Sequence, residues 1–214
     1  MSAVEPRPRL RGTLHAVAFV VSCVVGALFL SYTPPGDVFA GAVFAISVCV
    51  MLGTSALYHR VTWRPSVRAW MRRADHTAIF LLIAGTCTPV ALIGLTGAWR
   101  PTVLAVVWGG AGLAAITQMC WVRSPKWLSA ALGIAVGWAA VAALPELAQN
   151  EGLVPLFLIL AGGLAYTAGA VVYAVGRPDP LPRTFGYHEI FHALTLLALG
   201  CQYVAIAFFI VHVT

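Results

Sequence analysis

The sequence predicts an all-α integral membrane protein built as a bundle of seven transmembrane helices. Of its 214 residues, 60% are hydrophobic and only 9% are charged, whereas a soluble domain carries about a quarter charged residues. The apolar residues form runs of about 18–25 residues, which is long enough to cross ~30 Å of hydrocarbon as helices. The sequence lacks the alternating pattern of a transmembrane β-barrel.

The predicted spans follow one another with short connections. They cover residues 13–32, 38–58, 76–95, 102–121, 128–145, 153–175 and 188–212. Proline and glycine mark turns between them, and the fifth run is short and rich in Gly and Ala. The first run is too long for a signal-peptide core, so we expect it to be retained. We therefore expect a tail over residues 1–12 and a single membrane domain over residues 13–214, with the Arg- and Trp-rich loop 59–74 lying along the lipid surface.

Basic residues distinguish the two faces of the predicted bundle. One face holds 12 of the 13 Lys and Arg residues, and the other holds only Arg100. The 12 are Arg7, Arg9, Arg11, Arg60, Arg64, Arg68, Arg72, Arg73, Arg123, Lys126, Arg177 and Arg183. The positive-inside rule predicts a cytoplasmic N-terminus and, with seven spans, an outside C-terminus, which is opposite to a rhodopsin-like receptor. Since these residues lie in short loops, we expect no nucleic-acid binding from the net charge of +6.

Five polar side chains fall at one membrane depth on the cytoplasmic side. His188 and His192 are four residues apart and share a helix face at the start of the last span. Ser55 and His59 end the second span, and Asp75 precedes the third. Three neutral imidazoles with one open position form a common zinc site, so we predict zinc bound by the histidines. Imidazoles also suit copper or nickel, and they argue against calcium.

Each of these residues also has a purely structural interpretation. The histidines can anchor helix ends at the interface, Asp75 can cap a helix, and Ser55 can bond to its own helix backbone. Because chance would have to bring all of them to one depth, we favour the metal site. A carboxylate beside it can orient a water molecule or take its proton.

Other histidines are expected to lie outside the site. His76 points about 100° away from Asp75 on a helix, and His212 is at the opposite end of its span. His15 lies near the cytoplasmic start of the first span and is close enough to support the ligands, but we expect it not to do so.

The stretch from His188 to His192 also matches the zinc metalloprotease pattern HExxH, with Glu189 as the general base. An intramembrane protease is therefore an alternative. It would need a third ligand on a later span, and no predicted span follows.

Three motifs in order resemble the hemolysin III family, which belongs to the progestin and adipoQ receptor superfamily and is related to alkaline ceramidases. They are Ser55-x-x-x-His59, the stretch from Asp75 to Pro89, and His188-x-x-x-His192. Cys87 stands where the family often has Tyr. The resemblance covers nearly the whole chain. It implies zinc bound by the three histidines, with Ser55 and Asp75 beside it, in a membrane hydrolase or a receptor-like relative.

Two functions follow from these residues. The first is a zinc-dependent hydrolase of lipid amides or esters, in which Asp75 acts as base or proton carrier and Ser55 stabilises the oxyanion. Its partner would be a membrane lipid entering from the inner leaflet. The alternative is a receptor-like, regulatory or haemolytic pore-type protein in which zinc is structural. Compact loops suit a bacterial plasma-membrane protein.

Overall fold

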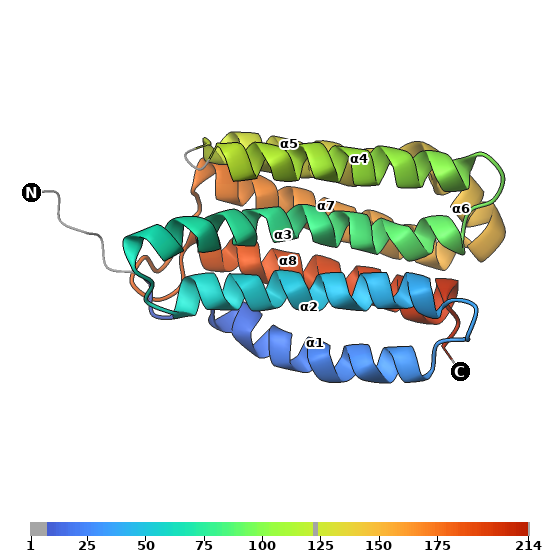
Figure 1. Cartoon of the computed structure of the whole chain (residues 1–214), viewed down its shortest axis with the longest axis horizontal. Helices are drawn as coiled ribbons and strands as arrows, with labels where there is room; N and C mark the ends of the chain where they lie inside the picture. The colour runs from blue at the N-terminus through green and yellow to red at the C-terminus, as the bar shows by residue number, and fades with distance from the viewer. Residues whose placement is uncertain (1–7, 122–123, 214) are drawn as a thin grey trace, which may run out of the picture.

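The computed structural model describes residues 8–121 and 124–213, which form helices and no strand (Figure 1). The helices are α1 (Thr13–Ser31), α2 (Val38–Arg60), α3 (Pro65–Leu92), α4 (Trp99–Cys120), α5 (Lys126–Trp138), α6 (Leu144–Glu151), α7 (Leu153–Val175) and α8 (Tyr187–Val204). A 3-10 turn at Val141–Ala143 precedes α6, and a π-helical segment at Ala205–Ile210 continues α8. Seven segments of the described chain are long and apolar enough to span a membrane, which confirms the predicted bundle.

The fifth span is a broken helix. It consists of α5, the 3-10 turn and α6, and it runs over Lys126–Glu151, further than the predicted 128–145. Pro145 lies in the first turn of α6, where proline is tolerated because the first amide groups of a helix have no partner in it. The eight α-helices therefore make seven spans.

The third span begins earlier than expected. The predicted surface loop 59–74 is wrong, because α3 starts at Pro65 and continues for 28 residues. A helix of this length measures about 42 Å, which exceeds the ~30 Å hydrocarbon core. Its first turns thus carry arginines on a rigid helix outside the apolar layer. Hydropathy did not predict this start because a helix can begin well before its apolar run begins.

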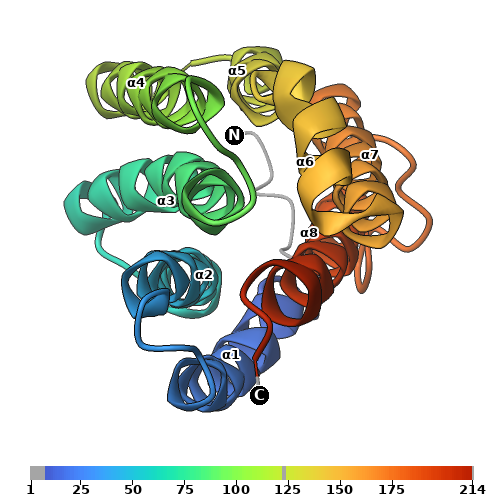
Figure 2. The same ribbon diagram turned by 90° about the vertical axis from the view of Figure 1, so that its right-hand side faces the viewer.

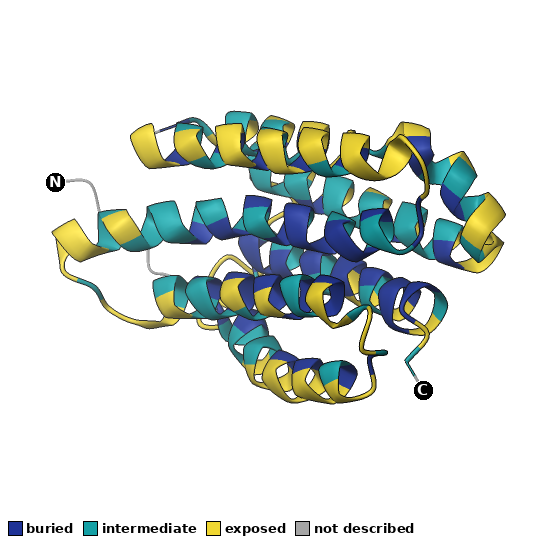
Figure 3. Cartoon of the chain, turned by 45° about the vertical axis from the view of Figure 1, so that its right-hand side comes forward, coloured by how far each residue is buried: buried dark blue, intermediate teal, exposed yellow. Residues whose placement is uncertain are grey.

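The helices follow one another around the bundle, as seen along its axis in Figure 2. Each span packs against the next span in the chain, and α8 closes the arrangement by contacting α1. Figure 3 shows buried residues along α2, α3 and α8, which belong to the most buried spans. The apolar side chains exposed on α1, such as Val20 and Val24, face outward, where lipid surrounds a membrane bundle.

The end of the bundle where α1, α3 and α8 begin holds the basic residues of the described chain other than Arg100, which lies at the start of α4. Two members of the predicted basic set, Arg7 and Arg123, lie outside the described residues. Residues 8–12 lie against the α7–α8 connection, where the Arg9 N–H donates to the Arg183 carbonyl oxygen at 3.0 Å. The cytoplasmic assignment of this end stays a prediction from charge.

Candidate metal centre

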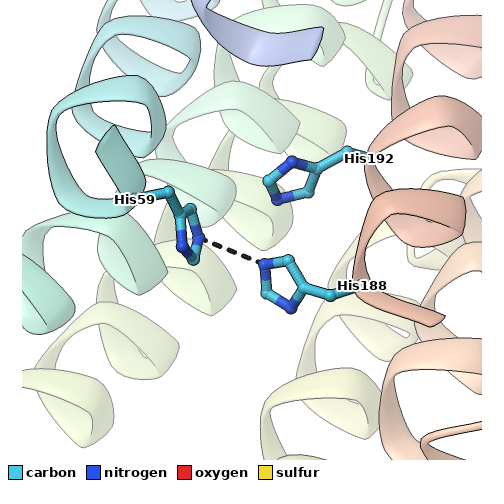
Figure 4. A group of neighbouring side chains, drawn as sticks. All are labelled: His59, His188 and His192. Atoms are coloured by element: carbon cyan, nitrogen blue, oxygen red, sulfur yellow. Dashed lines mark hydrogen bonds between the residues drawn. The ribbon is translucent and has the colours of Figure 1, made fainter. Parts of the chain in front are cut away.

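Three histidines converge at the basic end of the bundle (Figure 4). His59 comes from the last turn of α2, while His188 and His192 come from the first turns of α8. One ligand nitrogen from each lies within 4.8 Å of the others. The Nε2 atoms of His59 and His188 are 3.1 Å apart. The structure therefore brings together the three residues predicted to bind zinc.

The start of α8 is held by polar contacts that fix both of its histidines. The Glu189 Oε2 atom accepts a hydrogen bond of 2.8 Å from the Gly186 N–H. Its Oε1 atom forms an ion pair of 2.6 Å with Arg11, which precedes α1. The Tyr187 N–H donates to Asp179 at 3.0 Å. These contacts satisfy amide groups that the first turn of a helix leaves without partners.

The placement of Glu189 argues against a protease-like role for it. Its side chain is fully buried, and both of its oxygens are engaged by Gly186 and Arg11. The carboxylate therefore stabilises the first turn of α8. The sequence matches HExxH, but Glu189 is not placed as the general base of such a site.

Asp75 and Ser55 lie beside the histidines. The Asp75 Oδ2 atom is 3.7 Å from His59 Nε2, and both Asp75 and Ser55 are buried. Ser55 is also a hydrogen-bond partner of the Asp75 side chain. The capping interpretation of Asp75 is wrong, because the residue that caps α3 is Arg64. The structure therefore brings the predicted carboxylate and hydroxyl to the three imidazoles.

His15 is part of this cluster, and the expectation that it lies apart is wrong. Its Nδ1 atom is 2.8 Å from the Ser55 hydroxyl. Its ring stacks on that of His192, with centroids 3.7 Å apart and planes 10° from parallel. His15 thus holds the orientation of one predicted ligand and one predicted catalytic residue. Its place in the first turn of α1, at the same end of the bundle, was the feature of the sequence that could have indicated this contact.

The remaining histidines are not among the three converging residues. His76 pairs with Gln118 of α4 at 3.2 Å. His212 is near Glu151 at the other end of the bundle, with Nε2 and Oε2 3.5 Å apart.

The three imidazoles fit a zinc ion. Zn–N bonds of ~2.0–2.1 Å in a tetrahedron separate ligand nitrogens by about 3.3 Å, close to the 3.1 Å between His59 and His188. The His192 Nδ1 atom is buried without a hydrogen-bond partner among the described residues. A cation bound by one nitrogen of each ring would engage the three lone pairs that converge here.

An apolar cavity of about 200 Å³ leads away from the site. Asp75, His188 and His192 line one end of it. From there it runs between α3, α5, α7 and α8 and reaches Leu95 and Leu147, towards the opposite end of the bundle. The polar cluster therefore stands at the end of a long apolar chamber.

The comparisons with known proteins agree with this architecture. A family model described as "Haemolysin-III related" matches residues 4–203. Hemolysin-3 of Bacillus cereus is 32% identical over 173 residues, which cover 81% of this chain and 76% of the relative. A hemolysin-3 homolog of Bacillus subtilis (strain 168) is 26% identical over 202 residues, which cover 94% and 91%. With seven apolar spans among its described residues, this is a multi-pass protein of the bacterial cell membrane. Since the family model spans nearly all of it, the chain belongs to the hemolysin III family.

Proposed function

We propose that this protein is a zinc-dependent hydrolase that cleaves an amide or ester bond of a membrane lipid. The observation that carries the proposal is the position of the cluster. Three imidazoles, a carboxylate and a hydroxyl meet where an apolar cavity ends. Lipid-amide hydrolysis is also what the resemblance to alkaline ceramidases suggests.

His59, His188 and His192 would hold the metal. When bound there, zinc supplies a Lewis acid that polarises a carbonyl oxygen and makes water more acidic. Stacking on His15 keeps the His192 ring in one orientation. The buried ion pair of Glu189 keeps the first turn of α8 in place, so the two ligands on that helix stay together.

Side chains of the protein would transfer the proton and stabilise the developing charge. The Asp75 carboxylate lies beside the imidazoles and would take a proton from water and pass it to the leaving group. Ser55 accepts from or donates to His15, and its hydroxyl would support the oxyanion or position Asp75. The apolar walls of the cavity would hold an acyl chain and keep bulk water away. With the predicted orientation, the lipid would enter from the inner leaflet.

A second candidate is a structural zinc site in a non-catalytic membrane protein. The observation that favours it is the 3.7 Å between Asp75 and His59, because a carboxylate so close to the imidazoles can become a fourth ligand and close the site. A receptor-like, regulatory or haemolytic role would then use zinc only to tie α2, α3 and α8 together.

The test combines metal content with turnover. We expect about one zinc per chain by elemental analysis in the detergent-purified protein, and none in His188→Ala/His192→Ala. His212→Ala is the matched control, because this histidine lies far from the site. Asp75→Asn should keep zinc and lower hydrolysis of a ceramide, or of another lipid amide or ester that the wild type cleaves, by about 10²–10⁴-fold.

The two candidates give different results with Asp75→Asn. Retained zinc with lost turnover supports catalysis. Lost zinc, in a protein that hydrolyses none of these lipids, supports the structural site. Undiminished turnover in the variant contradicts the role given to Asp75, and a metal-free wild type contradicts both candidates.

A further inference from the structure

A second cavity lies over the metal centre at the same end of the bundle. We call it the basic vestibule. It is open on one side and has a volume of about 300 Å³. Its walls carry four basic side chains, three tyrosines and one carboxylate, besides three histidines. The basic and tyrosine side chains are Arg11, Arg68, Arg72, Lys126, Tyr58, Tyr173 and Tyr187.

The charge of the vestibule is positive after its internal pairs are taken into account. Arg11 is bound to Glu189 at 2.6 Å, which neutralises it. Arg68, Arg72 and Lys126 then face a single carboxylate, that of Asp75. This lining favours an anion over a cation.

The hydrogen-bond donors of the vestibule are suited to an anion with several oxygens. Lys126 Nζ donates to the Tyr187 hydroxyl oxygen at 2.7 Å, so the hydroxyl proton of Tyr187 remains available to a ligand. The ammonium also lies 5.7 Å from the Tyr173 ring centroid. Arg68 lies 5.6 Å from the Tyr58 ring centroid. Guanidinium groups bind phosphate through paired hydrogen bonds, which makes a phosphate the matching ligand.

The vestibule and the apolar cavity share walls. Asp75, His76, Tyr173 and His188 line both of them. A molecule with an anionic head and an apolar tail can therefore occupy both spaces at once. The bond between its head and its tail would then lie next to the histidines.

Membrane topology alone does not account for this arrangement. Arginines in a cytoplasmic loop satisfy the positive-inside rule wherever their side chains point. On the first turns of α3, however, Arg68 and Arg72 are four residues apart and line the vestibule. Arg64 is exposed, and Arg73 bonds to the Met119 carbonyl oxygen at 2.9 Å and lies outside the vestibule lining.

We propose that the basic vestibule binds the phosphate group of a phospholipid whose apolar tail extends into the cavity. Where the lipid is also the substrate, the inference rests on the proposed hydrolase function and narrows its substrates to phosphate-bearing lipids. The binding itself requires no turnover, and its test is independent of hydrolysis.

The experiment compares two ether lipids that contain no amide or ester bond between glycerol and tail. The delipidated full-length protein in a neutral detergent is titrated with a dialkylglycerol phosphate or with the dialkylglycerol that lacks the phosphate, and bound lipid is counted by native mass spectrometry. We expect the wild type to bind the phosphate lipid at least about tenfold more tightly, since charge-assisted hydrogen bonds provide discrimination of this order. Arg68→Gln/Arg72→Gln should lose the preference. Arg64→Gln/Arg73→Gln, which removes the same charge from the same segment, should keep it.

Three outcomes overturn the inference. The first is equal binding of the two lipids by the wild type, and the second is an equal loss of preference in the two double variants. The third comes from thermal unfolding: if inorganic phosphate alone stabilises the protein as much as the phosphate lipid does, the site belongs to a soluble anion. Failure of the hydrolase proposal is seen separately. A protein that hydrolyses no lipid but keeps the tenfold preference retains the phosphate site without the enzyme activity.

Discussion

Gly85 marks the closest approach of α2 and α3, and replacing it with alanine should destabilise the bundle. A Cβ atom at position 85 would lie 2.5 Å from Ser47 Cβ and 3.2 Å from the Val43 carbonyl oxygen, and nearer still to Ser47 Oγ. Ordinary contacts of this kind measure about 3.5–4.0 Å, so the two helices must separate by roughly 1 Å. Overpacking of this sort costs about 1–3 kcal/mol. At ~2–4 °C per kcal/mol, a cost of about 2 kcal/mol lowers Tm by about 4–8 °C.

The measurement is thermal unfolding in detergent, followed by circular dichroism. Gly112→Ala in α4 is the matched control, because a Cβ there meets no atom within 4 Å, and we expect its Tm to be unchanged or slightly raised. Adding Ser47→Gly should recover most of the loss relative to Ser47→Gly alone, as a double-mutant cycle measures. Equal stability of Gly85→Ala and the wild type, or no recovery in the double variant, would refute the packing argument. Zinc content should not change, since Gly85 is ten residues, about 15 Å, from Asp75 along α3.

Three further predictions concern the metal centre. Chelation should lower the Tm of the wild type but leave that of His188→Ala/His192→Ala unchanged, because only the former has metal to lose; equal shifts would count against the site. Glu189→Gln should lower stability by about 1–3 kcal/mol in denaturant unfolding, because it breaks a buried ion pair, yet retain most of its zinc by elemental analysis; a variant as stable as the wild type would contradict the role of that pair. His15→Phe should preserve the ring stacking and the zinc but lose the hydrogen bond to the serine hydroxyl, so lipid turnover should fall about tenfold or more. Unchanged turnover would show that this hydrogen bond has no part in catalysis.

Most of the fold follows from hydropathy and turn residues. The sixth span, Leu153–Val175, has the bounds that the apolar run predicts. The errors occur where the chain leaves the apolar layer. Arg68 and Arg72 looked like loop residues, yet Pro65 starts a helix there, and no Gly or further Pro interrupts it before the apolar run begins. The positions of charged residues indicate where the hydrocarbon layer ends, but they do not indicate where a helix begins or ends.

The composition of the polar cluster was predictable from depth, but its internal contacts were not. Spacing on α8 and the alternation of spans were enough to gather His59, His188 and His192 at one level. Depth does not say which neighbours face one another around the bundle. For this reason the stacking of His15 on His192 and the ion pair of Glu189 emerged only with the helices in place.

The contacts that α8 makes with the N-terminal part of the chain have a consequence for biogenesis. His59 and His188 are 129 residues apart in sequence, and at ~5–20 residues per second the ribosome makes them about 6–26 s apart. Until α8 enters the membrane, the nascent protein offers one of the three converging imidazoles and leaves Arg11 without its carboxylate partner. If the triad holds a metal as proposed, capture by all three histidines would therefore be a late step that follows insertion of the last span. A product truncated before α8 would lack the site altogether.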